Sequence, residues 1–330
     1  MKNAADTSGK APRNRTLSLS PGERARLEKT LLQPAAPLRP EEVSDRLIWD
    51  DLRHAAPLLP DNFADLLILD PPYNLGKEFN GRRFSPLDDR GYLKYLGDWL
   101  DALRHCLKPD ASIYLCGDWR CSAAGYFALA ERFEIRNRIV WQREKGRGAR
   151  NNWKNCTEDI WFATVGKKYH FDVDAVKQLR RVLAPYRENG APKDWHETAE
   201  GRFRLTCPSN FWDDLTVPFW SMPENTPHPT QKPEKLLAKL ILASSRPGDL
   251  VLDPFMGSGS TPVTAYKLGR RYCGIEIDRD YCCLAAKRLV RAESDRGIQG
   301  YHNGVFLERN CPPPHLPPDG GCPQDKGGNM

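Results

Sequence analysis

Two acidic turns, each directly behind an apolar run, constrain the fold of this 330-residue chain more than any other feature. Asp70 follows Leu66–Leu69 and opens the tetrapeptide Asp-Pro-Pro-Tyr; Asp253 follows Leu250–Leu252 and opens a turn with two glycines. A short apolar run that ends in a turn is typical of a buried strand, and open α/β sheets bind ligands where such strands end. Both turns are therefore predicted to lie at a ligand site.

Strand-like runs alternate with amphipathic helices along most of the chain, which is the pattern of a parallel sheet covered on both faces. The clearest helix is Tyr92–Leu107, whose leucines fall on one face, and Glu234–Ser245 and Asp278–Ala292 show the same periodicity. The fold class is therefore α/β, with a doubly wound, mostly parallel sheet. The expected strands are Arg46–Trp49, Leu66–Leu69, Ser112–Cys116, Arg138–Gln142, Asp159–Thr164, Leu250–Leu252 and Tyr272–Ile275.

The two ends of the chain and one internal region depart from this pattern. Residues 1–40 are polar and interrupted by prolines, so we expect a flexible segment with at most a short helix over Glu23–Leu32 outside the core. Residues 308–330 are rich in proline and glycine and are expected to be disordered. Between them, a catalytic domain over 41–307 would carry an irregular, basic and aromatic insertion at about 143–224 that meets the substrate.

Composition favours a cytoplasmic protein with a polyanionic partner. The formal net charge is +6 and the sequence pI is about 8.7. The ten cysteines include no Cys-x-x-Cys pair, and no secretory signal peptide opens the chain, so we expect reduced thiols and no metal site. No apolar run approaches ~18 residues, so no membrane span is expected.

Together the two turns resemble the amino-methyltransferases of DNA, which transfer a methyl group from S-adenosylmethionine to an exocyclic nitrogen of a base. The resemblance covers about Leu47 to Leu289. The Asp-Pro-Pro-Tyr turn precedes the insertion and the glycine turn follows it, which is the family's beta arrangement, a circular permutation of the same sheet. The resemblance implies a Rossmann-like methyltransferase fold, one catalytic domain formed from both ends of the chain, and a target-recognition role for 143–224.

The glycine turn is suited to hold the methyl donor. Gly257 and Gly259 let the backbone approach a ligand, and free amides at the following helix start favour its carboxylate. Glu276 ends the next strand, like the acid that binds ribose hydroxyls in nucleotide folds. The segment His228–Pro233 and an acid after the first strand, Asp51 or its neighbour Asp50, enter by resemblance. The implied cofactor-binding residues are Asp51, Thr230, Lys232, Asp253, Pro254, Phe255, Gly257, Ser258, Gly259, Thr261 and Glu276.

The Asp-Pro-Pro-Tyr turn is suited to activate an exocyclic amine, whose lone pair is delocalised into the base. The carboxylate of Asp70 and the carbonyl of Pro71 can accept its two N–H bonds, and proline stiffens the turn that holds them. Tyr73 offers a ring on which a flipped base can stack. The predicted catalytic residues are Asp70, Pro71, Pro72 and Tyr73.

A basic stretch that follows the strand Arg138–Gln142 is predicted to contact DNA. It contains five basic residues and one acid, with two glycines that make it pliable. The alternative is an ordinary solvated loop. The predicted DNA-binding residues are Arg143, Lys145, Arg147, Arg150, Asn151, Asn152 and Lys154.

Several functional questions stay open from the sequence. Aspartate at position 70 marks adenine enzymes in the family, so we expect methylation of adenine N6 in duplex DNA, with cytosine N4 as the alternative. A DNA-binding module that has lost the chemistry is the competing interpretation; an NAD-linked oxidoreductase is disfavoured because Pro262 replaces the third glycine of the dinucleotide motif. A cognate restriction endonuclease, and a monomeric or a homodimeric state, are all compatible with the sequence.

Overall fold

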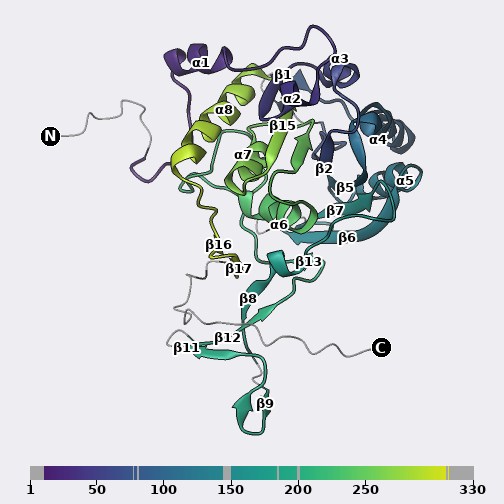
Figure 1. The fold of residues 1–330 in the computed structure, drawn as a ribbon. Coiled ribbons are helices and arrows are strands. Elements are labelled where there is room, and N and C mark those ends of the chain that lie inside the picture. Colours follow the sequence, from purple (N-terminus) through teal and green to yellow (C-terminus); the bar gives the residue numbers. More distant parts are fainter. Residues whose placement is uncertain are drawn as a thin grey trace, which may run out of the picture.

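The computed structural model describes residues 11–76, 78–79, 82–143, 150–183, 186–198, 201–309 and 311. An eight-stranded sheet forms its centre, in the order β1-β15-β14-β2-β5-β7-β6-β13 (Figure 1). Within the described residues, β7 alone runs antiparallel to its neighbours in this sheet. The strands are β1 Arg46–Trp49, β2 Ala64–Leu69, β5 Leu107–Gly117, β6 Glu134–Gln142, β7 Thr157–Thr164, β13 Phe211–Trp212, β14 Leu250–Asp253 and β15 Arg271–Glu276.

All seven predicted strands are present, and the late strands β14 and β15 lie between β1 and β2. Strands from both ends of the chain therefore form this one sheet, as the resemblance implied. Successive side chains of a strand point to opposite faces, and in β2 Leu67 and Leu69 enter one core while Leu66 and Ile68 enter the other. Both faces are thus buried, which confirms the doubly wound α/β class.

Helices cover both faces of the sheet (Figure 1). Leucines of α4 pack in the first core, and those of α6, with cysteines and alanines of α8, pack in the second. The predicted helix Tyr92–Leu107 ends early, because Arg104–Cys106 form a 3-10 turn and Leu107 already begins β5. The helices are α1 Pro21–Glu28, α2 Pro40–Val43, α3 Leu52–Ala55, α4 Asp89–Leu103, α5 Ser122–Ala130, α6 Glu234–Ser244, α7 Ser260–Lys267 and α8 Arg279–Ser294.

The N-terminal helix is part of the core, which corrects the expectation that it lies outside. Ser20 caps α1 and Pro21 occupies its first turn. Leu27 is buried in the same cluster as the inner face of α8. Ahead of this helix, the backbone of Arg15 and Leu17 donates hydrogen bonds to the carbonyls of Trp220 and Asn225. The sequence concealed this packing because α1 carries few apolar residues.

The insertion is divided between two parts of the fold. Its first part, 143–156, connects β6 to β7, and residues 144–149 of it lie outside the described part. Its second part forms most of a five-stranded sheet, in which the late strands β16 and β17 also take part. The late strands join because β17 pairs in parallel with β8. This sheet consists of β8 Gln178–Arg181, β11 His196–Thr198, β12 Gly201–Thr206, β16 Tyr301–His302 and β17 Val305–Leu307.

Two small hairpins complete the fold. The hairpin of β9 Arg187–Glu188 and β10 Ala191–Pro192 extends away from the main sheet (Figure 1), and β3 Glu78–Phe79 pairs with β4 Arg82–Arg83 after the Asp-Pro-Pro-Tyr turn. Of the predicted tail, the structure describes residues 308, 309 and 311. In the portion of the chain that the structure covers, no helix is long and apolar enough to cross a membrane.

Candidate active site

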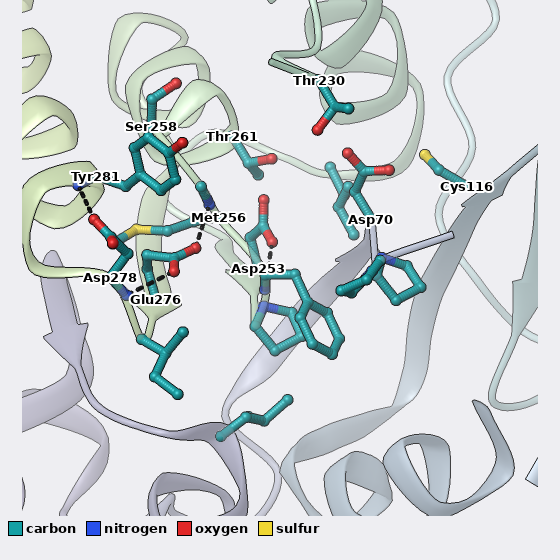
Figure 2. A pocket seen from close by; sticks show the side chains of 18 of the residues that line it. Asp70, Cys116, Thr230, Asp253, Met256, Ser258, Thr261, Glu276, Asp278 and Tyr281 are labelled. Carbon is teal, nitrogen blue, oxygen red and sulfur yellow. Dashed lines mark hydrogen bonds between the residues drawn. The ribbon is translucent and has the colours of Figure 1, made fainter. Parts of the chain in front are cut away.

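Acidic residues stand at the carboxyl ends of four neighbouring strands. Asp51 follows β1, Glu276 ends β15, Asp253 ends β14 and Asp70 follows β2. These side chains line one cavity of about 360 Å³. Figure 2 shows Asp70, Asp253 and Glu276 in its wall. The strand order explains the arrangement, because parallel neighbours place their carboxyl ends along one edge of the sheet. The sequence predicted each acid separately, and the fold brings them together.

Most predicted site residues line this cavity. They are all four catalytic residues, together with Asp51, Thr230, Lys232, Asp253, Pro254, Phe255, Gly257, Ser258, Thr261 and Glu276. Gly259 is absent from the lining. It caps α7 with a φ of +80°, and a Cβ there would lie 2.4 Å from that of Ala285 on α8. Its role in the structure is therefore the close packing of two helices.

The carboxylate of Asp70 is paired with a buried lysine. Nζ of Lys232 lies 2.8 Å and 2.7 Å from the two carboxylate oxygens, and it also donates to the hydroxyl of Tyr73 at 3.1 Å. Burial alone would lower the pKa of Lys232, but the carboxylates of Asp70 and Glu158 raise it above its ordinary value. Lys232 was expected at the methionine end of the cofactor, and the structure places its ammonium on the predicted catalytic acid.

The backbone of the Asp-Pro-Pro-Tyr turn is held by neighbouring side chains. The hydroxyl of Tyr92 on α4 donates to the carbonyl of Pro72 at 3.1 Å. Asn74, directly after the turn, exchanges two hydrogen bonds of 2.7 Å with the backbone of Leu87. These contacts hold the backbone of the turn on the C-terminal side of Pro71. Preorganised acceptors of this kind lower the cost of reorganisation during a reaction.

At the glycine turn, one buried carboxylate, Asp253, and one half-buried carboxylate, Glu276, lie beside backbone amides. Oδ1 of Asp253 accepts from the amide of Phe255 at 3.0 Å, and Glu276 accepts from the amides of Gly257 at 3.1 Å and Asp278 at 2.8 Å (Figure 2). Burial raises the pKa of Asp253 to about 7 and that of Glu276 to about 7. Both groups therefore bind a proton near neutral pH, and both would give it up for a cationic or hydroxyl-bearing ligand.

The remaining wall combines an apolar surface with a second pair of acids. Phe255 lines the cavity and packs edge to face against Trp99 of α4, with ring centroids 5.8 Å apart. Asp51 caps α3 by accepting from the amide of Arg53 at 2.9 Å. Its neighbour Asp50, the alternative candidate, also lines the cavity and contacts the imidazole of His54. The structure thus leaves both acids at the site.

These residues fit S-adenosylmethionine by their chemistry. Among the described lining residues, Asp50, Asp51, Asp70, Asp253, Glu276 and Asp278 are acidic, and Arg53 and Lys232 are strongly basic. An acidic, partly apolar cavity suits a ligand that combines a sulfonium and an ammonium with an adenine ring and two ribose hydroxyls.

Sequence reasoning missed several residues around this cavity. The hydroxyl of Thr226 donates to Oε1 of Gln231 at 2.7 Å and accepts from the hydroxyl of Ser258 at 2.9 Å, which ties the segment before α6 to the glycine turn. Cys116 at the end of β5 and Tyr281 of α8 also line the cavity. The strand and helix periodicity placed these elements correctly but gave no signal for which of their polar side chains reach a site.

The predicted DNA-binding residues fall into three groups. The guanidinium of Arg143 pairs with the buried Glu158 of β7, which also accepts from the hydroxyl of Tyr73 in the cavity wall. Lys145 and Arg147 lie outside the described residues. The other four are exposed in the chain leading to β7, beside Trp153, whose side chain is 93% exposed. Those four are Arg150, Asn151, Asn152 and Lys154.

Comparisons with known proteins agree with this geometry. Residues 64–287 match a family model described as DNA methylase. The DNA adenine methyltransferase YhdJ of Escherichia coli K12 is 34% identical over 227 residues, which are 67% of this chain and 74% of that protein. The Type II methyltransferase M.HpaI of Haemophilus parainfluenzae is 32% identical over 246 residues, which are 74% of this chain and 72% of that protein.

Solved structures share the fold. The PvuII DNA methyltransferase (cytosine-N4-specific) superimposes with a TM-score of 0.55 at 17% identity, over 84% of this chain and 97% of that one. The M1.HpyAVI–SAM complex gives a TM-score of 0.50 at 24% identity, over 74% of this chain and 98% of that one. The predicted Rossmann-like architecture is thereby confirmed.

Proposed function

Because the chain belongs to the family of N6-adenine and N4-cytosine DNA methyltransferases, we propose that it methylates the N6 amine of an adenine flipped out of duplex DNA. The methyl donor is S-adenosylmethionine. One observation carries the proposal: Asp70 and Pro71 line the same cavity as the glycine turn, so an amine held by these two acceptors lies next to the donor site.

The chain's own residues supply orientation and charge stabilisation. The Asp70 carboxylate and the Pro71 carbonyl accept the two N–H bonds of the amine, which turns its lone pair toward the cavity. As positive charge develops on the nitrogen, the carboxylate stabilises it. Tyr73 adds a ring beside the base. The donor, when bound, supplies the electrophilic methyl group, and no covalent bond to the protein is needed.

At the donor site, we assign each part of the ligand to a group of residues. The carboxylate of Glu276 accepts hydrogen bonds from the ribose hydroxyls, and Phe255 and Ile277 contact the adenine. Asp253 lies nearest the cationic part of the ligand. Backbone amides of the Gly257–Ser258 turn face its carboxylate.

Affinity for S-adenosylmethionine should rise as the pH is raised from 6 to 8. Glu276 has a pKa of about 7 in the ligand-free chain, and only its ionised form is a full acceptor for the ribose hydroxyls. If binding holds the group ionised, linkage predicts roughly a tenfold gain over this interval. Calorimetric titrations at several pH values measure it. In Glu276→Gln this tenfold contribution should disappear, while the contribution of Asp253, whose pKa burial also raises to about 7, and any titration of the ligand itself remain; equal pH slopes in the two proteins would contradict the assignment.

Adenine is favoured over cytosine, although both amines need the same acceptors. The adenine-specific relative YhdJ is 34% identical, and position 70 carries the aspartate expected of adenine enzymes. Cytosine N4 is the second candidate, since the PvuII enzyme shares the fold. Incubating unmodified duplex DNA with the protein and S-adenosylmethionine, then separating the nucleosides by mass, decides between them. Formation of N4-methylcytosine alone would overturn the adenine assignment, and absence of any methylated base would overturn the function.

Duplex DNA is the partner, and the exposed residues before β7 are its proposed contact. Replacing both Arg150 and Lys154 with glutamine should weaken DNA binding. The slope of log affinity against log salt concentration should become less steep by about 2, because each phosphate contact releases roughly one counterion. Lys29→Gln with Arg39→Gln changes the net charge equally and serves as the control. Wild-type affinity of the Arg150/Lys154 variant at every salt concentration would show that other residues contact DNA.

The biological setting follows from the substrate. We place the protein in the cytoplasm with the chromosomal DNA. A Type II relative supports a restriction-modification setting, in which a cognate endonuclease cuts the same site. Methylome sequencing of a host that expresses the chain identifies the site, and sedimentation distinguishes a monomer from a homodimer.

A further inference from the structure

Behind the Asp-Pro-Pro-Tyr turn, a buried glutamate shares the lysine that pairs with Asp70. Glu158 lies on β7, and its side chain is only 5% exposed. Its Oε2 lies 3.5 Å from Nζ of Lys232 and accepts from the hydroxyl of Tyr73 at 3.1 Å. Its Oε1 pairs with the guanidinium of Arg143, just past the end of β6. Two acids therefore compete for one buried ammonium.

The position of this ammonium matters for the reaction. Lys232 donates to both oxygens of Asp70, and these are the oxygens that must accept from the target amine. A cation held there weakens the carboxylate as an acceptor and opposes the positive charge that develops on the attacking nitrogen. Any group that draws the ammonium away from Asp70 therefore favours methyl transfer.

We propose that Glu158 is a positioning residue that draws the Lys232 ammonium away from Asp70 and so keeps Asp70 available for the target amine. The inference rests on the proposed function, because it concerns the same acceptor. Glu158 is well placed to act in this way, since Arg143 and the Tyr73 hydroxyl fix its two oxygens and the carboxylate cannot turn away from Lys232. Glu158 does not touch the base or the donor in this scheme; it acts through Lys232.

The first test replaces Glu158 with glutamine, which keeps the size of the side chain and removes its charge. Methyl transfer in a single turnover, at saturating DNA and S-adenosylmethionine, should slow by about tenfold or more. The dissociation constants for both ligands should stay within about twofold, since Glu158 contacts neither. Glu134→Gln, a change at an exposed glutamate on β6, is the matched control and should leave the rate unchanged.

The second test asks whether Glu158 acts through the lysine. In Glu158→Gln, Asp70 is the one carboxylate left beside the ammonium among its described ion-pair partners, so removing the ammonium should restore activity, and the double variant Glu158→Gln/Lys232→Met should be faster than Glu158→Gln. This double variant loses one charge of each sign, so it preserves the net charge of the cluster, and circular dichroism verifies its fold. A purely structural role would make the two substitutions add to a greater loss.

The results of these tests distinguish a wrong role for Glu158 from a wrong proposed function. An unchanged rate in Glu158→Gln, or a double variant no faster than Glu158→Gln, overturns the role of Glu158 while the wild-type chain still methylates DNA. A slower Glu158→Gln with intact ligand affinity, relieved by the lysine substitution, supports it. A wild-type chain that methylates no DNA overturns the proposed function, and this inference falls with it.

Discussion

Replacing Asp70 with alanine is expected to lower the rate of methyl transfer by ~10²-fold or more, the usual loss when one preorganised group is removed from a reaction site. The carboxylate is the only charged acceptor we assign to the target amine, and no other side chain of the turn can replace it. The donor should still bind, because the amides and acids that hold it lie on β14, β15 and the glycine turn. Single-turnover assays and calorimetry measure the two quantities separately.

Two further variants make this prediction specific. Asp70→Ala leaves the Lys232 ammonium with fewer acceptors, so Asp70→Asn is needed as well, because it retains the shape of the side chain while removing its charge. Asp98→Ala, at an exposed acid paired with Lys94 on α4, controls for the loss of one aspartate. If Asp70→Asn retains more than half the wild-type rate, Asp70 is not the acceptor for the amine.

Replacing Gly257 with valine is expected to reduce affinity for S-adenosylmethionine by on the order of a hundredfold, equivalent to about 2–3 kcal/mol. Gly257 has a φ of +52°, which a β-branched residue rarely adopts, and a Cβ there would lie 2.8 Å from Nε2 of His228. His228 and Gly257 both line the donor cavity, so the added side chain must displace its wall. Calorimetry measures the affinity.

The matched control for this substitution is Gly269→Val. Gly269 also has a positive φ, of +73°, but among the described residues beyond its two chain neighbours no atom lies within 4 Å of the position that a Cβ would take. Both variants therefore carry the cost of backbone strain, about 1–3 kcal/mol, and only Gly257→Val obstructs the cavity. Equal donor affinity in the two variants would show that Gly257 does not border the donor. Far-UV circular dichroism confirms that each remains folded.

Elements with strong local signals were predictable from the sequence. The strands around Leu66–Leu69 and Leu250–Leu252 are short apolar runs that end in acidic turns, and the structure places both in the centre of the sheet. The end of the helix that starts near Tyr92 was not predictable in this way. Leu107 continues the 3.6-residue spacing, yet its backbone is already part of β5, because burial in a strand and burial in a helix both favour leucine.

What decides the roles of individual polar residues is the pairing of distant elements. The sequence determined by itself that Asp70, Asp253 and Glu276 end strands, since each follows its own apolar run. Only the sheet order placed these acids along one edge. Lys232 followed the family's donor segment in sequence, but the tertiary structure directs its ammonium onto Asp70.

Glu158 is the clearest example of a residue whose role depends on the pairing of distant elements. Its position in a strand was nearly predictable, because the sequence predicts a strand that begins at the next residue, Asp159. The neighbouring residues in the sequence do not indicate that the carboxylate of Glu158 has a functional role. It reaches Lys232 because β7 runs antiparallel beside β5 and thereby brings a residue from the start of its strand to the carboxyl edge of the parallel strands. The periodic spacing of apolar residues and the length of apolar runs depend on residues that are close in sequence. The contact between Glu158 and Lys232 joins positions 74 apart in the chain. The physical reason is that burying the sheet fixes strand order and direction, and these in turn fix which charged side chains must pair.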